Sequence, residues 1–445
     1  MHAPLSDRTG SASRQITGIP APIEWDRCPM RVISPRPLPL VAALGVTQII
    51  GYGSIYYAFP ILAPAVAQEF GVAEPFLFGL FSVGLLLGGF AAPALGGLLD
   101  RVGAARVMTA GSLSMALLLT LLAFAPGIWT FGALTILVEL LSFAVLYDAA
   151  FAMLAQKHPA DTRKSITRLT LIAGFASTIF WPLSGFLIEA VGWRGTQLIF
   201  AASHCLCAGL HYWTMAVPVS GGSTSSVDTS LQKPSSPPVM SPTVARRAFQ
   251  LLAVGFALTG MAVSAVTVHL VEILRSLDIG EAAYIAAMVM GPAQVVVRVM
   301  DATVWRNRHP LFVAILSAAA ILAAILLLLL PGPASLLAFA FAAILGAGAG
   351  LSSIVRGAVP VALFGASGLG LRLGRLAAIR NVLGASAPFL FAWVAAAYSM
   401  TWAVGAALVV SVTGLGALLL LHSHLERLGI VPPLRSKPVR HGMSA

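Results

Sequence analysis

Long runs of apolar residues alternate along the chain with short segments that carry most of the charges. A helix needs about 20 apolar residues to cross the hydrocarbon core of a bilayer, and runs of that length recur throughout the chain. The runs are continuous rather than alternating with a period of two, which favours helices over the strands of a membrane barrel. We predict an all-α membrane protein with twelve transmembrane helices, at residues 39–66, 75–98, 105–125, 129–154, 166–188, 195–217, 246–274, 281–304, 310–330, 334–357, 376–397 and 401–423.

The composition supports this prediction and raises a question about charge. Of the 445 residues, 58% are hydrophobic and only 10% are charged, and the mean hydropathy is +0.90. A soluble domain carries about 25% charged residues, so a soluble protein is excluded. The net charge of +11 would suit a nucleic-acid-binding protein, so the placement of the basic residues decides its meaning.

The basic residues fall on one side of the predicted membrane. If the N-terminus lies in the cytoplasm, all but two of the 27 Lys and Arg residues fall in or next to cytoplasmic segments, the exceptions being Arg194 and Arg275. This asymmetry follows the positive-inside rule and predicts an even number of spans with both termini cytoplasmic. It explains the charge without a nucleic-acid partner, and we expect the chain to lie in the lipid bilayer of a bacterial inner (plasma) membrane.

A Ser- and Pro-rich segment divides the predicted spans into two groups of six. It reads GGSTSSVDTS and then, after one leucine, QKPSSPP, which is typical of a flexible linker. The predicted organisation is a disordered cytoplasmic tail at 1–37, a six-helix bundle at 38–218, a cytoplasmic linker at 219–244, a second six-helix bundle at 245–424 and a cytoplasmic tail at 425–445. The two halves share no clear residue-level repeat, so this symmetry rests on the number of spans.

The loop between the second and third predicted spans carries the most specific motif in the chain. It reads Gly97-Leu98-Leu99-Asp100-Arg101-Val102-Gly103-Ala104-Ala105-Arg106. The loop resembles the signature loop of the major facilitator superfamily, in which a Gly precedes an Asp by three residues and a basic residue, a Gly and a final Arg follow. The departures are Ala104 and Ala105, which stand where the pattern often has a basic residue.

The residues of this loop suit a gate between helices. Gly97 permits two helices to approach closely, and Asp100 can cap a helix N-terminus or pair with a base. We expect Gly103 to make a sharp turn and Arg106 to anchor the next helix, with Arg101 as the basic residue of the motif. The alternative is an ordinary basic loop that only obeys the positive-inside rule.

The resemblance extends from about residue 37 to residue 424 and implies a fold and a mechanism. In the major facilitator fold, two six-helix bundles face each other across a cavity that opens alternately to either side. The resemblance also implies that the first, fourth, seventh and tenth helices line the cavity. Because the chain has no GxxxxGK[ST], HExxH or GxSxG motif, ATP-driven pumping and membrane enzymes are disfavoured. We expect a secondary transporter for a small molecule that is not an enzyme, needs no cofactor and is monomeric.

Two carboxylates lie within the fourth predicted span, where a charge costs about 2.5–3.5 kcal/mol on insertion scales. Glu139 is near the middle of the span and Asp148 is nine residues later. On a continuous helix nine residues turn the chain by about 900°, which places the two side chains on opposite faces. We therefore expect only Glu139 to face the cavity, or to form an interhelical hydrogen bond while protonated, and Asp148 to pair with a base such as Arg168.

The eighth predicted span contains a candidate anion site. Its sequence Gly291-Pro292-Ala293-Gln294-Val295-Val296-Val297-Arg298 resembles a stretch of monocarboxylate transporters in which an Asp one turn before an Arg handles proton and carboxylate. Arg298 matches the Arg, and a guanidinium suits a planar carboxylate. Gln294 replaces the Asp, which puts proton coupling at that position in doubt. Alternatively, Arg298 reaches the interface or forms a helical ion pair with Asp301.

Polar and aromatic side chains in the first predicted span are further candidates. Tyr52 and Tyr56 share one helix face at a spacing of four, and Gln48 adds an amide on that face. The face either lines the cavity or packs within the bundle. The sixth span contains Cys205 and Cys207 near two histidines, but residues two apart on a helix point about 200° from each other, so we predict no metal site there.

These features favour secondary transport by alternating access, coupled to protons and directed to a small organic anion. The alternative is an efflux carrier for a toxic compound, either a drug or a metalloid, since drug exporters also place a carboxylate in the first half. The identity of the substrate, the direction of transport and the coupling ion cannot be read from the sequence.

Overall fold

The computed structural model describes residues 38–219, 240–277, 279, 282–331 and 333–434. The predicted tail at 1–37, most of the predicted linker and residues 435–445 lie outside the described residues, so the predictions for them stay predictions.

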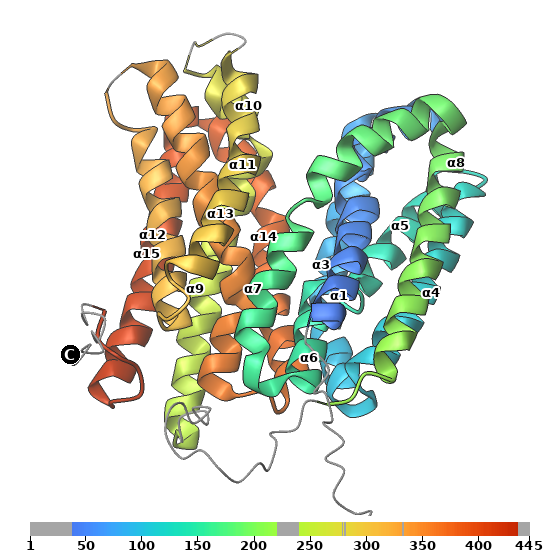
Figure 1. Cartoon of the computed structure of the whole chain (residues 1–445). Helices are drawn as coiled ribbons and strands as arrows, with labels where there is room; N and C mark the ends of the chain where they lie inside the picture. The colour runs from blue at the N-terminus through green and yellow to red at the C-terminus, as the bar shows by residue number, and fades with distance from the viewer. Residues whose placement is uncertain (1–37, 220–239, 278, 280–281, 332, 435–445) are drawn as a thin grey trace, which may run out of the picture. The chain divides into compact units, whose positions relative to one another are not determined.

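Six membrane passes make up the first half of the described chain. Its helices are α1 (Leu38–Tyr52), a π-helical turn (Gly53–Tyr57), α2 (Phe59–Phe70), α3 (Glu74–Val102), α4 (Ala104–Ala123), α5 (Ile128–Ser142), α6 (Tyr147–Lys157), a short 3-10 turn (Pro159–Asp161), α7 (Thr162–Ala173) and α8 (Ala176–Met215) (Figure 1). Helix α8 contains Gly192, whose φ of 70° and ψ of 173° are not helical. The ribbon bends over at the end of the bundle and runs back beside α4, so α7 and α8 together supply two passes (Figure 1).

The second half contributes six further passes. Its helices are α9 (Pro242–Val268), α10 (Leu270–Arg275), α11 (Ala282–Thr303), α12 (Pro310–Leu327), α13 (Ala334–Phe364), α14 (Leu369–Ala397) and α15 (Met400–Arg427). Eleven helical segments of the described chain are long and apolar enough to cross a membrane, and one of them, Pro159–Met215, has 57 residues. Counting that segment as two passes gives the predicted twelve.

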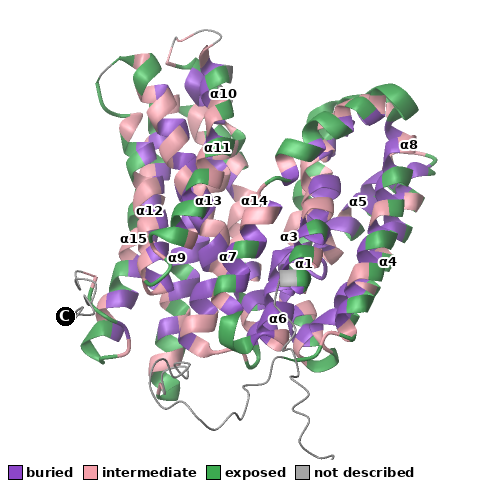
Figure 2. Ribbon diagram, viewed as in Figure 1, coloured by how far each residue is buried: buried purple, intermediate pink, exposed green. Residues whose placement is uncertain are grey.

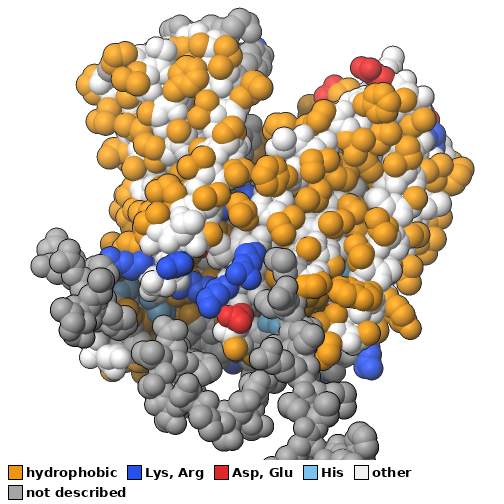
Figure 3. All heavy atoms as spheres, viewed as in Figure 1, with side chains coloured by type: hydrophobic (Ala, Val, Ile, Leu, Met, Phe, Trp, Pro, Cys, Tyr) orange, Lys and Arg blue, Asp and Glu red, His pale blue; other side chains and the backbone are white. Residues whose placement is uncertain are grey.

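Apolar side chains cover the outside of the bundles. Phe90, Leu117 and Trp129 are 65%, 60% and 76% exposed, whereas a soluble protein would bury most such side chains. Buried residues follow the inner faces of the helices (Figure 2), and hydrophobic side chains dominate the surface between the ends (Figure 3). This distribution confirms the prediction of a membrane protein.

Several predicted spans differ from the structure, and two of these differences affect the site. The fourth span is not one continuous helix, because the chain leaves the helical path between Ser142 and Tyr147, and Leu146 there is extended (φ −90°, ψ −166°). Helix α14 begins at Leu369, earlier than the predicted start at 376, so Arg372 is helical rather than part of a loop.

The halves meet closely along α3 and α14. A Cβ atom on Gly96 would overlap the carbonyl group of Gly370, and one on Gly370 would overlap that of Gly96. Backbone therefore packs on backbone, as in membrane helix pairs rich in small residues. This contact holds the start of α14 beside the end of α3, where the signature loop begins.

Candidate functional site

A polar cavity of about 170 Å³ lies between the two halves. Its first-half walls come from α1, the π-helical turn, α3, α5, α6 and the break between α5 and α6, and its second-half walls come from α13 and α14. The polar residues that line it are Tyr52, Tyr56, Glu139, Ser142, Asp148, Arg356, Arg380 and Asn381. The cavity thus brings two carboxylates and two guanidinium groups into one space.

Asp148 and Arg380 form an ion pair across the cavity. The Arg380 Nη2 and Asp148 Oδ2 atoms are 3.4 Å apart, and the two side chains are 20% and 9% exposed. Asp148 is the second residue of α6, where the positive end of the helix dipole favours a carboxylate. The prediction that Asp148 pairs with a loop base such as Arg168 is therefore wrong, because its partner lies in the other half.

Arg356 reaches the first half through an aromatic pair. Its Nη2 donates a hydrogen bond of 2.7 Å to the hydroxyl group of Tyr52, and its guanidinium carbon lies 4.8 Å from the ring centroid of Tyr147. Tyr52 and Tyr147 are themselves in contact, with ring centroids 4.6 Å apart. The Nε atom of Arg356 is buried and has no hydrogen-bond partner within the described residues. One donor of this guanidinium therefore remains available.

Glu139 is almost completely buried at 1% exposed. Neither of its carboxyl oxygens has a hydrogen-bond partner within 3.5 Å in the described part of the chain, and the Tyr56 hydroxyl group of the first pass is a polar neighbour of this carboxyl group. Its side chain lies against Gly84 of α3, where a Cβ atom would overlap it. Glu139 lines the cavity, as does Tyr56.

The break between α5 and α6 explains why both carboxylates reach one cavity. We predicted opposite faces for Glu139 and Asp148 on the assumption of a continuous helix, and this prediction is wrong. The helix is interrupted between α5 and α6, where Leu146 is extended, and this changes the rotation between the two side chains. The irregular segment lines a cavity rather than lipid, which is where such backbone is tolerated in a membrane.

Gln48 does not line the cavity and instead forms a hydrogen bond with the backbone between α5 and α6. It is fully buried, and its Nε2 donates a hydrogen bond of 2.8 Å to the carbonyl oxygen of Val145. A helix break leaves carbonyl groups without partners, and in a membrane each unpaired group costs several kcal/mol. Gln48 therefore lies apart from the cavity residues Tyr52 and Tyr56, with which we had grouped it.

Arg298 and Gln294 do not line the cavity in this conformation. Arg298 is buried, its Nη2 lies 3.4 Å from the Gln294 Oε1 atom, and its guanidinium group is packed against Gly174, where α7 ends. The helical ion pair considered for Arg298 is not formed within the described residues. Asp301 instead accepts a hydrogen bond from Thr167 of α7. Arg298 thus reaches across to the first half, at a different place from the cavity.

The signature loop caps a helix of the opposite half. The Asp100 Oδ1 atom accepts a hydrogen bond of 2.9 Å from the N–H of Gly370, and Oδ2 accepts one of 2.8 Å from the N–H of Leu371. These donors lie in the first turn of α14, where N–H groups have no partner within the helix. Of the two roles expected for Asp100, the structure shows the cap, which fastens the two halves together at this end.

Other residues of the loop meet the expectations in part. Gly103 makes the sharp turn between α3 and α4 with a φ of 97°. Gly97 was predicted to allow the close approach, but its neighbour Gly96 does so. Arg101 donates from Nε to the carbonyl oxygen of Gly97, and Arg106 is exposed.

Gln156 fastens the start of α4. It accepts a hydrogen bond from the N–H of Ala104 through Oε1 and donates from Nε2 to the carbonyl oxygen of Leu99. The role expected of Arg106 is thus filled by a side chain from α6.

We call the contact between Asp100 and the start of α14 the first latch. A second latch has the same arrangement with the two halves exchanged. Asp301, near the end of α11, accepts a hydrogen bond of 3.1 Å from the Thr167 hydroxyl of α7. Arg163 of α7 donates to the carbonyl oxygens of Trp305 and Arg308, which follow α11. In both latches the end of the second helix of one half contacts the beginning of the fifth helix of the other. The twofold relation is therefore visible in contacts where the sequence showed no repeat.

A neutral histidine stabilises the beginning of α12 beside this second latch. Burial lowers the pKa of His309 to about 4, and the nearby Arg163 and His422 act in the same direction. The ring is therefore neutral at neutral pH, and its Nδ1 accepts a hydrogen bond of 3.2 Å from the N–H of Leu311. Protonation would remove this acceptor from the helix N-terminus.

The two histidines of the sixth pass bind hydroxyl groups. His204 contacts Ser54 at 2.9 Å, and His211 contacts Ser112 and Thr47, both at 3.0 Å. Among the described residues no group of three or more His, Cys, Asp or Glu side chains could hold a metal ion.

The helix count, the cavity between two halves and the capped signature loop point to one family of proteins, and a sequence comparison decides the matter. The profile of the Major Facilitator Superfamily matches residues 44–351. The chain belongs to the Major Facilitator Superfamily. It is accordingly a multi-pass integral membrane protein and a secondary transporter of small molecules, not an enzyme.

Two proteins similar to this chain show how far the likeness extends. The chain is similar to the crystal structure of the human organic anion transporter MFSD10 (TETRAN), with a TM-score of 0.60 and 19% sequence identity. The match covers 88% of this chain and 100% of that one. This likeness concerns the fold alone. A Rahnella sp. (strain Y9602) protein named multidrug resistance protein MdtG is 30% identical over 129 residues, which is 29% of this chain and 31% of that protein.

Sequence reasoning missed the two cavity arginines of this superfamily member. Arg356 and Arg380 were counted among the cytoplasmic basic residues, because both lie near predicted helix ends. Arg380 is eleven residues beyond the first residue of α14, which places it about 16 Å along the helix. The signal for Arg356 was its position in the apolar run LSSIVRGAVPVALF. Asn381 and Tyr147 carried no such signal.

The cap formed by Asp100 yields a first prediction. Asp100→Asn keeps the size of the side chain but removes its charge from the N-terminus of α14, which should weaken the latch by about 1–2 kcal/mol. Transport by the purified protein in liposomes should fall roughly five- to thirtyfold, while the amount of inserted protein stays the same. Asp161→Asn, at an exposed carboxylate paired with Lys164, is the control. Normal transport by Asp100→Asn would show that this cap does not contribute to transport.

Proposed function

We propose that this transporter moves a small organic anion together with a proton, and that the anion binds between Arg356 and Arg380. One observation carries the proposal: two guanidinium groups of the second half share a cavity with Glu139 and Asp148 of the first half. A ligand held there touches both halves, as alternating access requires.

The charges of this cavity support coupling to a proton. With both carboxylates ionised, the two arginines and the two acids sum to zero. Protonation of one carboxylate leaves one positive charge in excess, which a monoanion neutralises. Because unpaired charge within the membrane is unfavourable, anion and proton should enter together. We assign the proton to Glu139, since it is buried and no ion-pair partner faces it in the described chain, and keep Asp148, which is paired with Arg380, as the second candidate.

The contacts of the two arginines favour a carboxylate as the bound group. The Arg380–Asp148 contact of 3.4 Å is longer than a strong charged hydrogen bond of about 2.7–2.9 Å. Asp148 Oδ1 and Arg356 Nε have no partner within the described residues. A substrate carboxylate can take over the Arg380 donors from Asp148 and accept from Arg356, forming the paired hydrogen bonds that guanidinium groups favour.

The volume of the cavity supports a small substrate. Pockets for drug-sized ligands occupy about 300–1,000 Å³, whereas this cavity measures about 170 Å³. Its lining is also rich in charged and hydroxyl groups. Both properties fit a short organic acid better than a lipophilic drug.

The anion is proposed to bind to Arg356 and Arg380 and not, as the sequence suggested, to Arg298. That residue stays a candidate for a different conformation, because its guanidinium group lies between α11 and Gly174. The monocarboxylate-transporter-like branch likewise stays a proposal, since Gln294 stands where that branch has its Asp.

Uptake by the purified protein tests the proposal. Liposomes containing the protein, with an acidic exterior, should accumulate radiolabelled lactate, and collapse of the pH gradient should abolish the accumulation. If a panel of monocarboxylates and dicarboxylates neither accumulates nor exchanges, the organic-anion proposal fails.

Efflux of a toxic compound is the second candidate function. It is supported by the name of the Rahnella protein, which shares 30% identity over 129 residues. A strain that expresses the transporter would then tolerate dyes, antibiotics or metalloids better than a strain without it. Such tolerance without carboxylate uptake would favour this candidate.

Orientation is a further prediction. Both termini and the linker are proposed to be cytoplasmic because of the distribution of Lys and Arg. In a variant without native cysteines, a single cysteine at Leu277 should react with an impermeant maleimide in intact cells, and one at Ser225 should react only after lysis. Labelling of position 225 in intact cells would reverse the orientation.

A further inference from the structure

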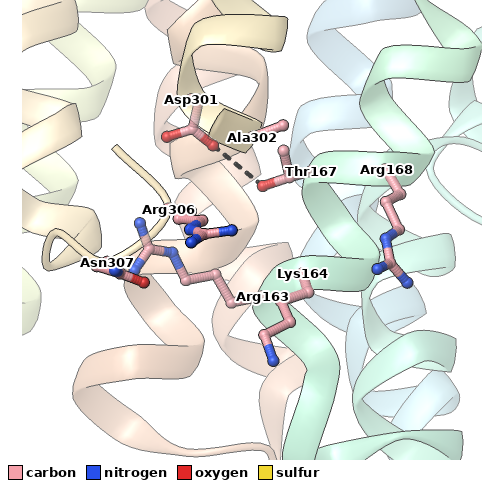
Figure 4. Close-up of a pocket in the computed structure, with 8 residues that line it drawn as sticks. All are labelled: Arg163, Lys164, Thr167, Arg168, Asp301, Ala302, Arg306 and Asn307. Carbon is pink, nitrogen blue, oxygen red and sulfur yellow. Dashed lines mark hydrogen bonds between the residues drawn. The ribbon is translucent and has the colours of Figure 1, made fainter. Parts of the chain in front are cut away.

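A second and larger cavity lies at the end of the helices where the basic residues gather, apart from the polar cavity described above. Its volume is about 400 Å³, and its walls come from α7 of the first half and from the end of α11 and the following segment of the second half. Figure 4 shows Lys164 and Arg168 extending from α7, and Arg306 approaching from the opposite side.

The lining of this cavity is strongly cationic. Arg163, Lys164, Arg168 and Arg306 face one carboxylate, that of Asp301. The Asp301 carboxylate accepts a hydrogen bond from Thr167, which also lines the cavity. Among the described residues that line it, the cavity therefore has more basic than acidic groups.

Two of the arginines are available to a ligand. Arg163 is already bound to backbone carbonyl oxygens, and Lys164 contacts Asp161 at 3.3 Å on the surface. Arg168 and Arg306 have neither an ion-pair partner nor a hydrogen-bond partner among the residues that the structure describes. Two unpaired guanidinium groups from opposite halves thus face one space. Phosphate oxygens match such groups in charge and geometry.

The position of the cavity indicates where the phosphate comes from. Val299 and Val296 precede the lining residue Ala302 by one and two turns of α11, and they are 44% and 59% exposed. Apolar surface of this kind faces acyl chains, and Figure 3 shows Lys and Arg side chains gathered below the hydrophobic surface. We therefore expect the cationic cavity to lie at the level of the headgroups. A soluble phosphate would gain nothing from the apolar wall.

We infer that this cavity binds the phosphate headgroup of an anionic phospholipid through Arg168 and Arg306. Since these arginines belong to different halves, the bound headgroup bridges α7 and the segment after α11. It therefore stabilises the conformation in which the second latch is closed. This inference does not depend on the proposed substrate.

Lipid binding by the full-length protein in detergent tests the inference. Phosphatidylglycerol and phosphatidylcholine with the same acyl chains are titrated and followed by native mass spectrometry. The double variant Arg168→Gln/Arg306→Gln should bind phosphatidylglycerol about thirtyfold more weakly, because each basic residue near an anionic lipid strengthens binding about fivefold. Arg246→Gln/Arg247→Gln removes two exposed charges of α9 outside this cavity and should change binding less than threefold.

Further measurements distinguish phospholipid binding from misfolding of the variants and from binding of soluble phosphate. Arg168→Lys/Arg306→Lys should recover most of the binding, and size-exclusion profiles establish that each variant is folded. Phosphatidylglycerol should also raise the thermal stability of the wild-type protein more than that of the Gln variant. Equal losses in the two Gln variants, or equal binding of both lipids, would overturn the inference. Inorganic phosphate that binds the wild type and displaces phosphatidylglycerol would reassign the cavity to a soluble ligand.

Discussion

Arg380→Gln should reduce transport about a hundredfold and also destabilise the protein. The substitution removes a donor of the proposed anion site, and a hundredfold loss corresponds to about 2.7 kcal/mol of binding free energy. It also leaves Asp148 without its ion-pair partner. Breaking a buried pair costs about 3–5 kcal/mol, and we expect about 3 kcal/mol because the Arg380 side chain is 20% exposed. Lactate uptake into liposomes and thermal unfolding in detergent measure the two effects.

A double variant separates the two roles of Arg380. Arg380→Gln/Asp148→Asn removes both charges of the ion pair, so most of the lost stability should return while transport stays low. Arg380→Lys keeps the ion pair but loses the planar fork, so it should unfold normally and transport about tenfold more slowly. Recovery of full transport in the double variant would make the pair purely structural and contradict the proposed anion site.

Glu139→Gln should abolish accumulation driven by a pH gradient and leave exchange of substrate intact. One proton moving with each monoanion can support about a tenfold accumulation for a gradient of one pH unit. Without a titratable group at this position, the accumulation ratio should fall to about one. Exchange needs no net release of a proton, so labelled substrate should still equilibrate across the membrane.

Glu189→Gln is the control, because Glu189 is an exposed carboxylate of α8. It should transport like the wild type. If Glu139→Gln still concentrates the substrate, the coupling proton resides elsewhere, and Asp148→Asn is the next variant to measure. If it loses exchange as well, Glu139 binds the substrate or maintains the cavity rather than carrying the proton.

The signature loop shows how much local chemistry can predict. A carboxylate three residues after a glycine and next to a turn was expected to cap a helix or pair with a base, and Asp100 caps α14. The turn at Gly103 was expected from the same pattern. Which helix receives the cap could not be predicted, because α14 begins 269 residues after Asp100 in the chain.

The cavity shows where such reasoning fails. The rotation between Glu139 and Asp148 was calculated for a continuous helix, but the helix is interrupted between α5 and α6, where Leu146 is extended. The partner that stabilises the break is Gln48, 97 residues earlier in the chain. Nothing in the local sequence of the fourth span indicates that a distant amide completes its hydrogen bonding.

The sequence by itself determined the membrane class, the twelve passes and the gate motif. Each follows from a local property: a run long enough to cross the bilayer, or a turn residue beside a charge. Only the tertiary structure decided which charges meet. Arg356 and Arg380 look like helix-end arginines along the chain, and Arg298 looks like the anion ligand, yet the first two line the cavity with Glu139 and Asp148 and Arg298 does not. The physical reason is that helix breaks and the packing of α3 on α14 set the rotation and depth of each side chain, and both depend on contacts between residues far apart in the sequence.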